Sequence, residues 1–489
     1  MKRTVLCILL LYTFVYYASA QDTFTLSMHQ KLEKMANELE AKLVVDRTAI
    51  QTIDVVKDFG ADNKGRRTTT KNLQKAIDAA AKKGQCRVVF PAGTYVTGTL
   101  FLRSGVHIEL EKGSQILGSV NIKDYPEIYP EYKSNTDLQV NKSLFYAEKV
   151  SDISISGSGS IDFRGTDKLY ATSGNNDPLR PFGIRIISSK NVYIGGLHLK
   201  NSAQWMQHYL NCDSVMIEKL DVFNHAHLNN DGLDIDGSRC VYVRNSNIDS
   251  SDDAICLKSN GMKACENILI ESCTAASHCN ALKLGTESTS GFRNILYRNC
   301  HVVQSVTGKA HVNGVPTTRT AITMIITDGG VMENIWFDGI DAVDCITPIF
   351  VTLGSRNRIH TPGAPKPAIG SISNIKISNL SAVGAGPISS MATGLDNERR
   401  IKNLILENVS FEISVPGKPE DRNADMDAIM KMAKPKYPSP HTWNTNLPSS
   451  GIYLRYVDGL ALHNINVKYK NNDSRNRIII KDCDRIVLD

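Results

Sequence analysis

Residues 239–272 read "RCVYVRNSNIDSSDDAICLKSNGMKACENILIES", and this stretch contains one short phrase twice. In both copies, RCVYVRN and ENILIES, polar residues precede alternating aliphatic side chains. Such alternation over about four to five residues is typical of a short β-strand with one buried and one exposed face. Aligned on Val241 and Ile268, the copies are 27 residues apart, so the stretch predicts a repeating unit with one such strand per period.

The same phrase recurs along most of the chain. Its central steps are 23, 26, 27 and 27 residues, and steps of about 40 residues occur where loops are inserted. This period, with Asn and Gly at the corners, is typical of a parallel β-helix, whose coils bury their inner faces by stacking. A leucine-rich repeat or a propeller needs a consensus that is absent here. We therefore predict an all-β protein, a right-handed parallel β-helix (solenoid). The phrase is anchored at Ile153, Val192, Val215, Val241, Ile268, Ile295, Ile335, Ile375, Leu404 and Leu460.

An N-terminal capping helix is predicted over residues 68–84. Leu73, Ile77 and Ala80 fall on one face of this helix, and Gly84 ends it. A solenoid needs such a cap because its end coil exposes apolar edges. A second amphipathic pattern, which we interpret as an accessory cap, is formed upstream by Leu32, Met35, Leu39 and Leu43.

The N-terminus predicts export. Residues 1–20 resemble a signal peptide, because a basic start precedes a short apolar run and Ala18-Ser19-Ala20 fits a cleavage site. The mature protein is then periplasmic or extracellular, with cleavage after Ala20. We assign residues 21–50 to an N-terminal helical extension and residues 51–489 to the β-helix domain. The sequence after the signal peptide predicts no membrane span.

Composition restricts the partners. The formal net charge of +6 is too weakly basic to indicate nucleic-acid binding, and it is compatible with an acidic polysaccharide. The 11 cysteines form no paired CxxC zinc pattern and no small disulfide-rich module. Their recurrence at similar steps favours buried free thiols at equivalent positions of the repeat. We expect no metal, no cofactor and a monomer.

Three acidic residues stand out inside the repeat. Asp231 lies in an Asn-Asn-Asp-Gly corner, and the adjacent Asp252 and Asp253 follow 21 and 22 residues later, nearly one coil. Equivalent positions on successive coils lie about 5 Å apart, so these carboxylates are expected to be neighbours. Glycoside hydrolysis needs one protonated and one ionised carboxyl group at such a place. The alternative is solvated turn residues, because Asn-Asp-Gly is also ordinary turn chemistry. The other acidic residues of this region, Asp234, Asp236 and Asp249, are interpreted as strand-edge and corner residues.

The order of these motifs resembles glycoside hydrolase family 28, the polygalacturonases and their relatives. That family carries Asn-x-Asp-Gly followed one coil later by Asp-Asp, which here are "NNDG" and "SSDDAICLKS". The entry region "VVFPAGTYVTGTLFLRSGVHIELEKGSQILGS", "ISGSGSIDFRG" and the closing "LPSSGIYLRYVDGLALHNINV" are also similar to it. The resemblance covers roughly residues 53–489, which makes residues 51–489 the predicted catalytic domain.

The resemblance implies a secreted, metal-free enzyme that cleaves α-linked, galacturonic-acid-containing (pectic) polysaccharide or oligosaccharide with inversion. Carried over to this chain, Asp252 is the general acid, and Asp231 and Asp253 hold and activate the water. Asn229 helps to shape the same corner.

The sequence departs from the family at the usual Gly-His-Gly, which becomes "SHCNALKLGTES". His278 could stand in for the family's histidine, but two extra residues separate it from the following strand. By strand register Asn280 falls there instead. Lys283 is a further neighbour, and its ammonium could contact a uronate or the catalytic carboxylates if it faces outwards.

A second departure concerns the family's Arg-x-Lys motif, which meets the sugar carboxylate. The place expected for this motif is occupied by Thr323, Met324 and Ile325. This puts simple polygalacturonate in doubt as the substrate and leaves rhamnogalacturonan as a competitor. The candidate replacements, each of which could equally be a solvated charge, are Arg319, Lys258 and Arg356.

Two further residues have open interpretations. Trp205 could be a platform on which a sugar ring stacks, or it could pack between loops. Asp328 could lie near the cleft or simply make a turn, and we interpret it as a turn residue. The excursions at 122–147, 164–182 and 416–450 are the expected walls of a cleft, and their shape would decide between internal and terminal cleavage.

Two other functions remain open at this point. A pectate lyase would share the fold but would need a calcium-binding acidic cluster and an Arg base. A non-catalytic glycan-binding or adhesin solenoid would use the Asp groups only as turns.

Overall fold

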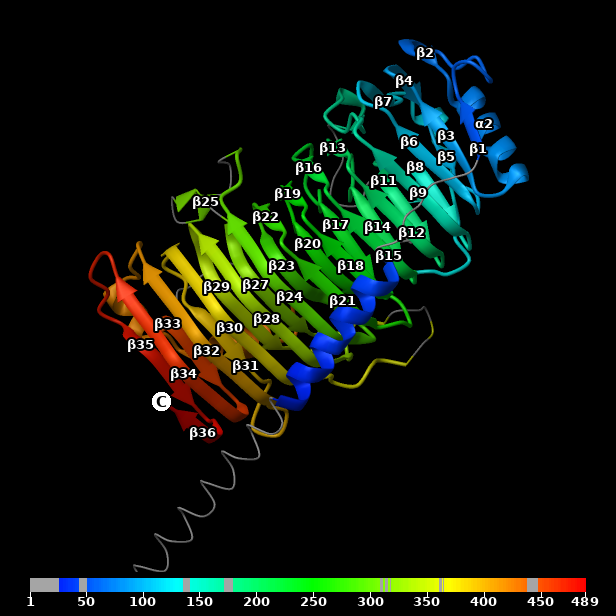
Figure 1. Ribbon diagram of the computed structural model, residues 1–489. Helices are drawn as coiled ribbons and strands as arrows, with labels where there is room; N and C mark the ends of the chain where they lie inside the picture. Colours follow the sequence, from blue (N-terminus) through cyan, green and yellow to red (C-terminus); the bar gives the residue numbers. More distant parts are fainter. Residues whose placement is uncertain are drawn as a thin grey trace, which may run out of the picture.

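The structure is a computed structural model and describes residues 26–43, 51–134, 141–170, 179–307, 311–312, 315–316, 318–359, 363, 365–437 and 447–489 (Figure 1). The predicted signal peptide, residues 1–20, lies outside these ranges. The predicted extension, residues 21–50, is described only as a helix over residues 26–43.

Parallel strands stacked into coils make up the body of the molecule, as predicted (Figure 1). A 22-stranded sheet, called sheet A, covers one side, and a 12-stranded sheet, called sheet B, covers another. In both sheets each strand pairs in parallel with its equivalent in the next coil. The right-handed parallel β-helix is therefore confirmed.

Sheet A contains β1 Gln51–Asp54, β2 Lys64–Thr68, β3 Cys86–Phe90, β4 Gly93–Thr97, β6 Val106–Leu110, β7 Ser114–Gly118, β9 Ser151–Gly157, β10 Ser160–Asp162, β12 Lys190–Gly195, β13 His198–Lys200, β15 Asp213–Glu218, β16 Asp221–Asn224, β18 Arg239–Arg244, β19 Asn247–Ser250, β21 Cys265–Glu271, β22 Thr274–Ser277, β24 Gly291–Val303, β28 Val331–Val343, β30 Ser371–Ala385, β32 Ile401–Ile413, β34 Val457–Tyr469 and β36 Asp484–Leu488.

Sheet B contains, in the order of their pairing, β5 Leu100–Phe101, β8 Ser143–Glu148, β11 Phe182–Ile187, β14 Gln207–Leu210, β17 Leu233–Asp236, β20 Ile255–Ser259, β23 Asn280–Ser288, β27 Thr318–Ile326, β29 Cys345–Leu353, β31 Ser390–Thr393, β33 Ser449–Arg455 and β35 Asn476–Lys481. A separate antiparallel pair is formed by β25 His311–Val312 and β26 Val315–Pro316. The described part of the chain also contains the short 3₁₀ helices η1 Ile122–Asp124, η3 Lys168–Tyr170 and η4 Pro419–Asn423.

The recurring phrase forms strands of sheet A. Val241 of β18 pairs with Ile268 of β21, which pairs with Ile295 of β24, and all three side chains are fully buried. The predicted period is thus the step from one coil to the next. From β24 onward the two sheet A strands of a coil merge into one long strand, which the phrase alone did not indicate.

A ladder of asparagines explains the polar start of the phrase. Each member has a φ between +53° and +59°, a left-handed conformation that Asn tolerates better than most residues. From the second member onward, each side-chain amide donates a hydrogen bond of 3.0–3.1 Å to the Asn one coil earlier. The corner is therefore fixed by backbone conformation and by stacking together. The ladder runs through Asn267, Asn294, Asn334, Asn374 and Asn403.

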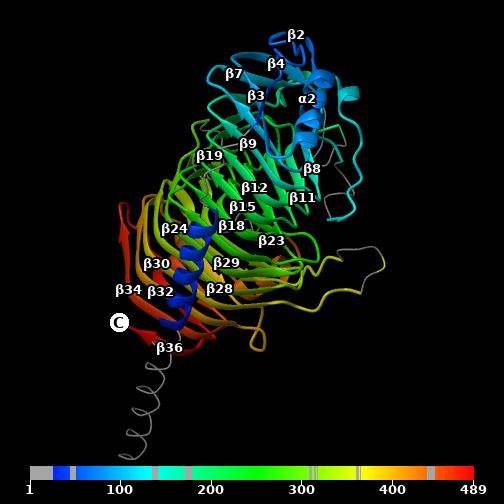
Figure 2. The ribbon, with the colours of Figure 1, turned by 45° about the vertical axis from the view of Figure 1, so that its right-hand side comes forward.

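Helix α2, Thr70–Lys83, closes the N-terminal end of the solenoid as predicted (Figure 2). Its Leu73, Ile77 and Ala80 are fully buried in the main core. Gly84, with φ +67°, follows the helix and returns its backbone N–H to the last turn.

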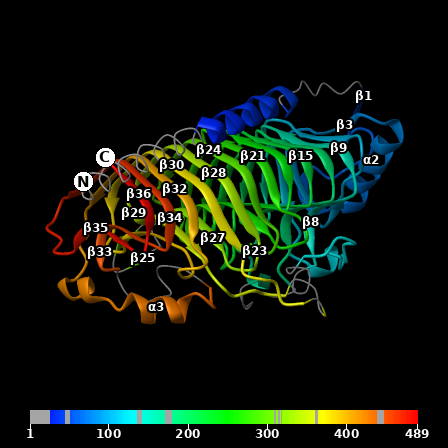
Figure 3. The same cartoon turned by 90° about the horizontal axis from the view of Figure 1, so that it is seen from below.

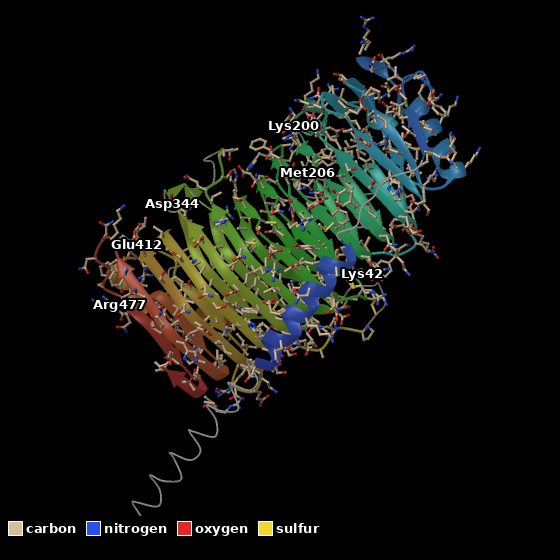
Figure 4. All side chains as sticks on the ribbon, in the orientation of Figure 1. Lys42, Lys200, Met206, Asp344, Glu412 and Arg477 are labelled. Carbon is tan, nitrogen blue, oxygen red and sulfur yellow. The ribbon has the colours of Figure 1, made fainter. Side chains whose placement is uncertain are left out.

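The helix over residues 26–43 lies elsewhere than predicted. It runs along the outer face of sheet A, not over an end of the solenoid, so its interpretation as an accessory cap is wrong (Figures 1 and 3). Lys42, which Figure 4 labels on this helix, donates a hydrogen bond of 2.9 Å to Ser214. Arg298 forms ion pairs with Glu33 and Glu40. The apolar side chains of the helix pack on outward residues from five consecutive coils, Met216, Tyr242, Leu269, Leu296 and Trp336.

The excursion predicted over residues 416–450 carries a helix, α3, Met426–Ala433. In Figure 3 it lies on the side of the coils opposite to the N-terminal helix. It packs against outward side chains of sheet B. Residues 438–446 of this excursion lie outside the described part of the chain.

The cysteines of the described residues are all free thiols, and most are buried, as the repeat predicts. No described helix is both long and apolar enough to cross a membrane.

Candidate active site

Outward positions of sheet B bring the candidate residues together. Along this face one row of paired residues runs from strand to strand. Asp234 of β17 pairs with Cys256 of β20, which pairs with Lys283 of β23, which pairs with Thr323 of β27. Lys258 pairs with Asp236 one coil earlier, also on the outer face. Because side chains alternate in a strand, the aliphatic residues between them fill the interior and the polar ones meet outside.

The Asn-Asn-Asp-Gly corner places Asp231 just before β17. Asn229 adopts φ +54°, and the buried Asn230 amide donates hydrogen bonds of 3.0 and 3.1 Å to the carbonyls of Ser202 and Gln204. A Cβ at Gly232 would lie 2.3 Å from a methyl carbon of Ile248, so only glycine fits there. The corner is a turn stabilised by its Asn and Gly residues, as the sequence suggested. It also fixes the position of the buried Asp231 carboxylate.

Lys258 is the shared cation of the site. Its ammonium nitrogen lies 3.0 Å from Asp231, 3.3 Å from Asp234 and 3.7 Å from both Asp253 and Glu287, measured to carboxylate oxygens. Its side chain is only 3% exposed. Truncating a charge so deeply paired would leave several buried carboxylates uncompensated.

Asp253 is held by a second cation from the next coil. The Lys283 ammonium donates to Asp253 at 2.6 Å, and the Asn280 amide donates to the other oxygen at 2.7 Å. The Thr323 hydroxyl donates to the Asn280 carbonyl oxygen at 3.0 Å and so orients the amide. Thr323, at the place expected for the missing Arg-x-Lys motif, thus supports the carboxylate cluster.

Neighbouring charges push the carboxyl pKa values apart. Burial alone would raise the pKa of Asp253, but the ammonium groups of Lys283 and Lys258 bring it below its ordinary value. Burial and the negative charge of Asp253 raise the pKa of Asp252. The pKa values of these adjacent carboxyl groups are therefore moved in opposite directions, the pattern expected of an acid and a base.

Two deeper carboxyl groups also hold protons more tightly than usual. Burial, reinforced by Asp234, raises the pKa of Asp231 well above its ordinary value despite Lys258. Burial raises the pKa of Asp234 to about 7. Asp234 was interpreted from sequence as a strand-edge residue, and its outward position in the alternating run "LDID" is the signal that could have placed it in the cluster.

Asp252 is the most accessible of the predicted catalytic carboxylates. It is partly exposed, whereas Asp231 and Asp253 are buried. The Asn229 amide lies 3.4 Å from its carboxylate. The Ser250 and Ser277 hydroxyls both donate to its backbone carbonyl and so fix this corner.

His278 lies next to a second histidine. Its ring packs 4.7 Å, centroid to centroid, from that of His225, and its Nε2 is 2.5 Å from the Thr307 hydroxyl. His225 in turn pairs with Asp249 at 2.7 Å, so Asp249 is a charge partner at this corner. From the "SHCNALKLGTES" segment, Asn280 and Lys283 are the side chains whose bonds reach Asp253.

Trp205 is 8% exposed and packs edge-on against Phe182 and His208. The Lys258 ammonium lies 4.6 Å from its ring centroid. These contacts favour packing and a cation–π interaction over the stacking of a sugar ring.

The two candidate arginines differ in their environments. Arg356 forms a bidentate pair with the buried Asp328 at 2.9 and 2.6 Å and approaches Glu287 at 3.8 Å. Asp328 is thus a charge partner as well as a turn residue. Arg319 is partly exposed, and among the described residues its buried Nε has no hydrogen-bond partner. Its charge reaches Cys279, where it partly offsets the rise that burial causes in the thiol pKa.

Sequence reasoning missed two residues of this region. Glu287 is pinned by cations: burial would raise its pKa, but Lys258, Arg358 and Arg356 lower it well below its ordinary value. Tyr437, from the excursion, accepts a hydrogen bond of 3.2 Å from Lys283. Glu287 lies in β23, the strand that carries Lys283, so its position could have been predicted from the sequence. No local sequence pattern links Tyr437 to the site.

One group of side chains could also hold a cation. The ligand atoms of Asp252, Asp253 and Cys279 lie within 4.8 Å of one another. Lys283 already contacts one oxygen of Asp253, so a protein ammonium competes for this place. The donor set is two hard oxygens and one soft sulfur, which matches neither calcium nor magnesium.

The fold and the carboxylate cluster together define a parallel β-helix with a candidate acid–base site on the outer face of sheet B. The profile of the glycosyl hydrolases family 28 matches residues 83–421. The chain therefore belongs to this family.

Individual relatives carry different names, and a solved structure shares the fold. The chain is 26% identical over 270 residues to a probable polygalacturonase of Vitis vinifera, covering 51% of this chain and 55% of that protein. It thus spans about half the length of that relative. It is 38% identical over 153 residues to plasmin and fibronectin-binding protein A of Streptococcus pneumoniae, covering 30% of this chain and 21% of that protein. The exopolygalacturonase of Thermotoga maritima shares the fold, with a TM-score of 0.67 at 19% identity, over 89% of this chain and 96% of that one.

Proposed function

We propose that this protein hydrolyses α-linked, galacturonic-acid-containing pectic polysaccharide or oligosaccharide. The observation that carries the proposal is the pair of adjacent residues Asp252 and Asp253, because Asp253 is paired with the Lys283 ammonium at 2.6 Å and Asp252 is partly exposed. Membership of a family of glycosyl hydrolases gives this acid–base pair its reaction.

In the proposed mechanism Asp252 is the general acid. Its raised pKa favours a proton on this carboxyl group, the most exposed of the three predicted acids, and the proton passes to the leaving glycosidic oxygen. Asp253, ionised beside Lys283, removes a proton from water. Asp231 binds the same water from the neighbouring coil. Attack on the face opposite the leaving group inverts the anomeric configuration.

The sugar carboxylate requires a cation that the carboxylate cluster does not already neutralise. Arg356 is committed to Asp328, and Lys258 lies beneath the acids. We assign the contact to Arg319, whose Nε lacks a hydrogen-bond partner among the described residues. A single arginine in place of an Arg-x-Lys pair keeps rhamnogalacturonan, in which uronate alternates with a neutral sugar, as the competing substrate.

Residues 1–20 are proposed to direct export, which would bring the enzyme to polysaccharides outside the cell. Cleavage after Ala20 then yields a mature chain beginning at Gln21. N-terminal sequencing of protein recovered from the periplasm or medium tests this cleavage site.

The test of function is the release of reducing ends from homogalacturonan, rhamnogalacturonan and oligosaccharides of each. The proposal expects release from at least one of them, without added calcium and without the absorbance of an unsaturated product. Proton NMR of the first product should show the inverted anomer. An unsaturated product would identify a lyase. Tight binding without release from any substrate would favour a glycan-binding protein.

A further inference from the structure

The outer face of sheet B changes character beyond the carboxylate cluster. The row that carries Lys283 continues through Thr323 and then becomes apolar, with Phe350 of β29, Met391 of β31 and Tyr453 of β33. These three side chains are at most 1% exposed. They form one buried cluster with side chains of the excursion, Met426, Met430, Ala433 and Leu447. Helix α3 therefore covers sheet B from β27 onward.

Polar contacts fix α3 in this place. Arg455 of β33 pairs with Asp427 at the start of the helix at 2.6 Å. Lys434, directly after the helix, is 4% exposed. Its nitrogen lies 2.7 Å from the Thr352 hydroxyl and 2.6 Å from the Thr393 hydroxyl, and it also donates to the carbonyls of Leu353 and Gly394. The segment is thus bound to β29, β31 and β33, and its course is set by the coils beneath it.

This fixed course ends at the catalytic cluster. Three residues after Lys434, the Tyr437 hydroxyl accepts a hydrogen bond of 3.2 Å from the Lys283 ammonium, which also lies 5.6 Å from the ring centroid. Tyr437 is 39% exposed, so part of its ring faces solvent beside Asp252 and Asp253. The segment from α3 to Tyr437 therefore begins over β33 and ends at β23. Strand β23 is the direct neighbour of β20, which follows Asp252 and Asp253.

We propose that α3 and Tyr437 form a blind end for the substrate on the outer face of sheet B, so that the enzyme removes only short products from one end of a chain. The proposal rests on the hydrolysis proposed above. The acids precede β20, and the cover by α3 begins at β27, two strand spacings or about 10 Å away. This is the length of a disaccharide, so at most two sugar units fit between the cleaved bond and α3. Tyr437 is the specificity-determining residue that contacts the sugar nearest the cleaved bond on this side.

The experiment follows product length at low conversion. Galacturonan and rhamnogalacturonan oligosaccharides of defined length are digested by the wild type, Tyr437→Ala and Tyr437→Phe, and products are separated by anion-exchange chromatography. The wild type should release only mono- or disaccharides from the first time point. Tyr437→Phe keeps the ring and should keep this product size. Tyr437→Ala should release longer products and raise KM about tenfold. Lys431→Gln, exposed on α3, is the matched control and should behave as the wild type.

A ladder of intermediate lengths from the wild type at low conversion would overturn the blind end while leaving hydrolysis established. Products of unchanged length from Tyr437→Ala would overturn the role of Tyr437. Absence of any hydrolysis would instead overturn the proposed function, and this inference would fall with it. Because Tyr437 is partly exposed, its replacement should leave the thermal midpoint unchanged, which circular dichroism checks before the digestions.

Discussion

At the scale of the residue, two lysines shift the pKa values of the clustered carboxyl groups by different amounts. Lys258 lies among four acidic side chains, and Lys283 is directed at one of them, Asp253. The carboxylate with two ammonium neighbours is stabilised in its charged form, whereas burial and the charge of Asp253 raise the pKa of the adjacent Asp252. Lys283 thus acts through Asp253 as a positioning residue.

Replacing Lys283 with Met should move the acid limb of the pH profile. Loss of the ammonium raises the pKa of Asp253, so a higher pH is needed to ionise the base. The acid limb of kcat/KM should shift upward by about one pH unit or more, with kcat about tenfold or more lower below that limb. A purely structural role of Lys283 would reduce activity equally at every pH. Lys190→Met, an exposed lysine of β12, is the matched control.

Asp234 predicts a dependence of stability on pH. Its pKa is raised to about 7 in the folded chain, whereas an unfolded Asp ionises near about 3.9. The unfolded chain therefore loses its proton first as the pH rises, and the stability contributed by this group is present below about pH 4 and lost as the pH passes 7. Between pH 5 and 7 the free energy of unfolding of Asp234→Asn should therefore fall less steeply with pH than that of the wild type. The difference between the two slopes is at most ~1.4 kcal/mol per pH unit. Urea titrations at several pH values measure this slope, and a slope equal to that of the wild type would contradict the assignment.

The predicted acids lie together in the structure because their spacing along the chain is a property of the coil. Asp231 and Asp253 meet at one ammonium since they are nearly one period apart. The partners of these acids were harder to predict. Lys258 spans several positions with a long side chain, and Tyr437 comes from 154 residues beyond Lys283. The choice among His278, Asn280 and Lys283 depends on strand register, which the structure supplies.

At the scale of the element, the repeat phrase predicted strands and corners for a physical reason. Its aliphatic residues alternate and its Asn residues supply the left-handed corners. The repeat phrase did not predict where the loops between coils run, because insertions in these loops leave the strand register unchanged. The steps of about 40 residues still stack on neighbours with shorter steps, as Ile295 does on Ile335.

Asn334→Ala should destabilise the chain by about 1–3 kcal/mol. The substitution places alanine at φ +56° and removes two ladder hydrogen bonds, to Asn294 and from Asn374. Asn334→Gly removes the same hydrogen bonds but adopts positive φ without steric cost, so it should lose less stability than Asn334→Ala. The midpoint of urea unfolding reports both, and Asn472→Ala, at an exposed site, should leave the midpoint in place. Equal midpoints for all three variants would contradict the ladder's role.

At the scale of the whole molecule, two helical segments cover opposite sides of the coils (Figure 3). The helix over residues 26–43 covers sheet A, and α3 covers sheet B near the acids. Amphipathic spacing predicted the first helix but not its position, because such a pattern specifies an apolar face and leaves the partner open. Its partner is an outward apolar row of sheet A, including Met216 and Trp336.

Leu32→Asp should separate stability from activity. Leu32 is fully buried against sheet A, and a charge there costs about 2–4 kcal/mol or detaches the helix. The thermal midpoint should fall by several degrees while kcat/KM, measured below the lowered midpoint, stays within about twofold. The exposed neighbour Lys31 provides the control, since Lys31→Asp should change neither quantity. A matching loss of activity in Leu32→Asp would mean that the helix supports the carboxylate cluster.

The most direct test of the account is the kcat of Asp252→Asn on the pectic substrate that the wild type cleaves best. The account predicts a loss of at least about 100-fold, because the leaving oxygen loses its proton donor, with an unchanged fold by circular dichroism. Asp221→Asn, which removes an exposed carboxylate paired with His198 on the far side of the same coils, should keep full activity. An Asp252→Asn protein that retained the wild-type kcat would contradict the assignment of the acid and the proposed mechanism.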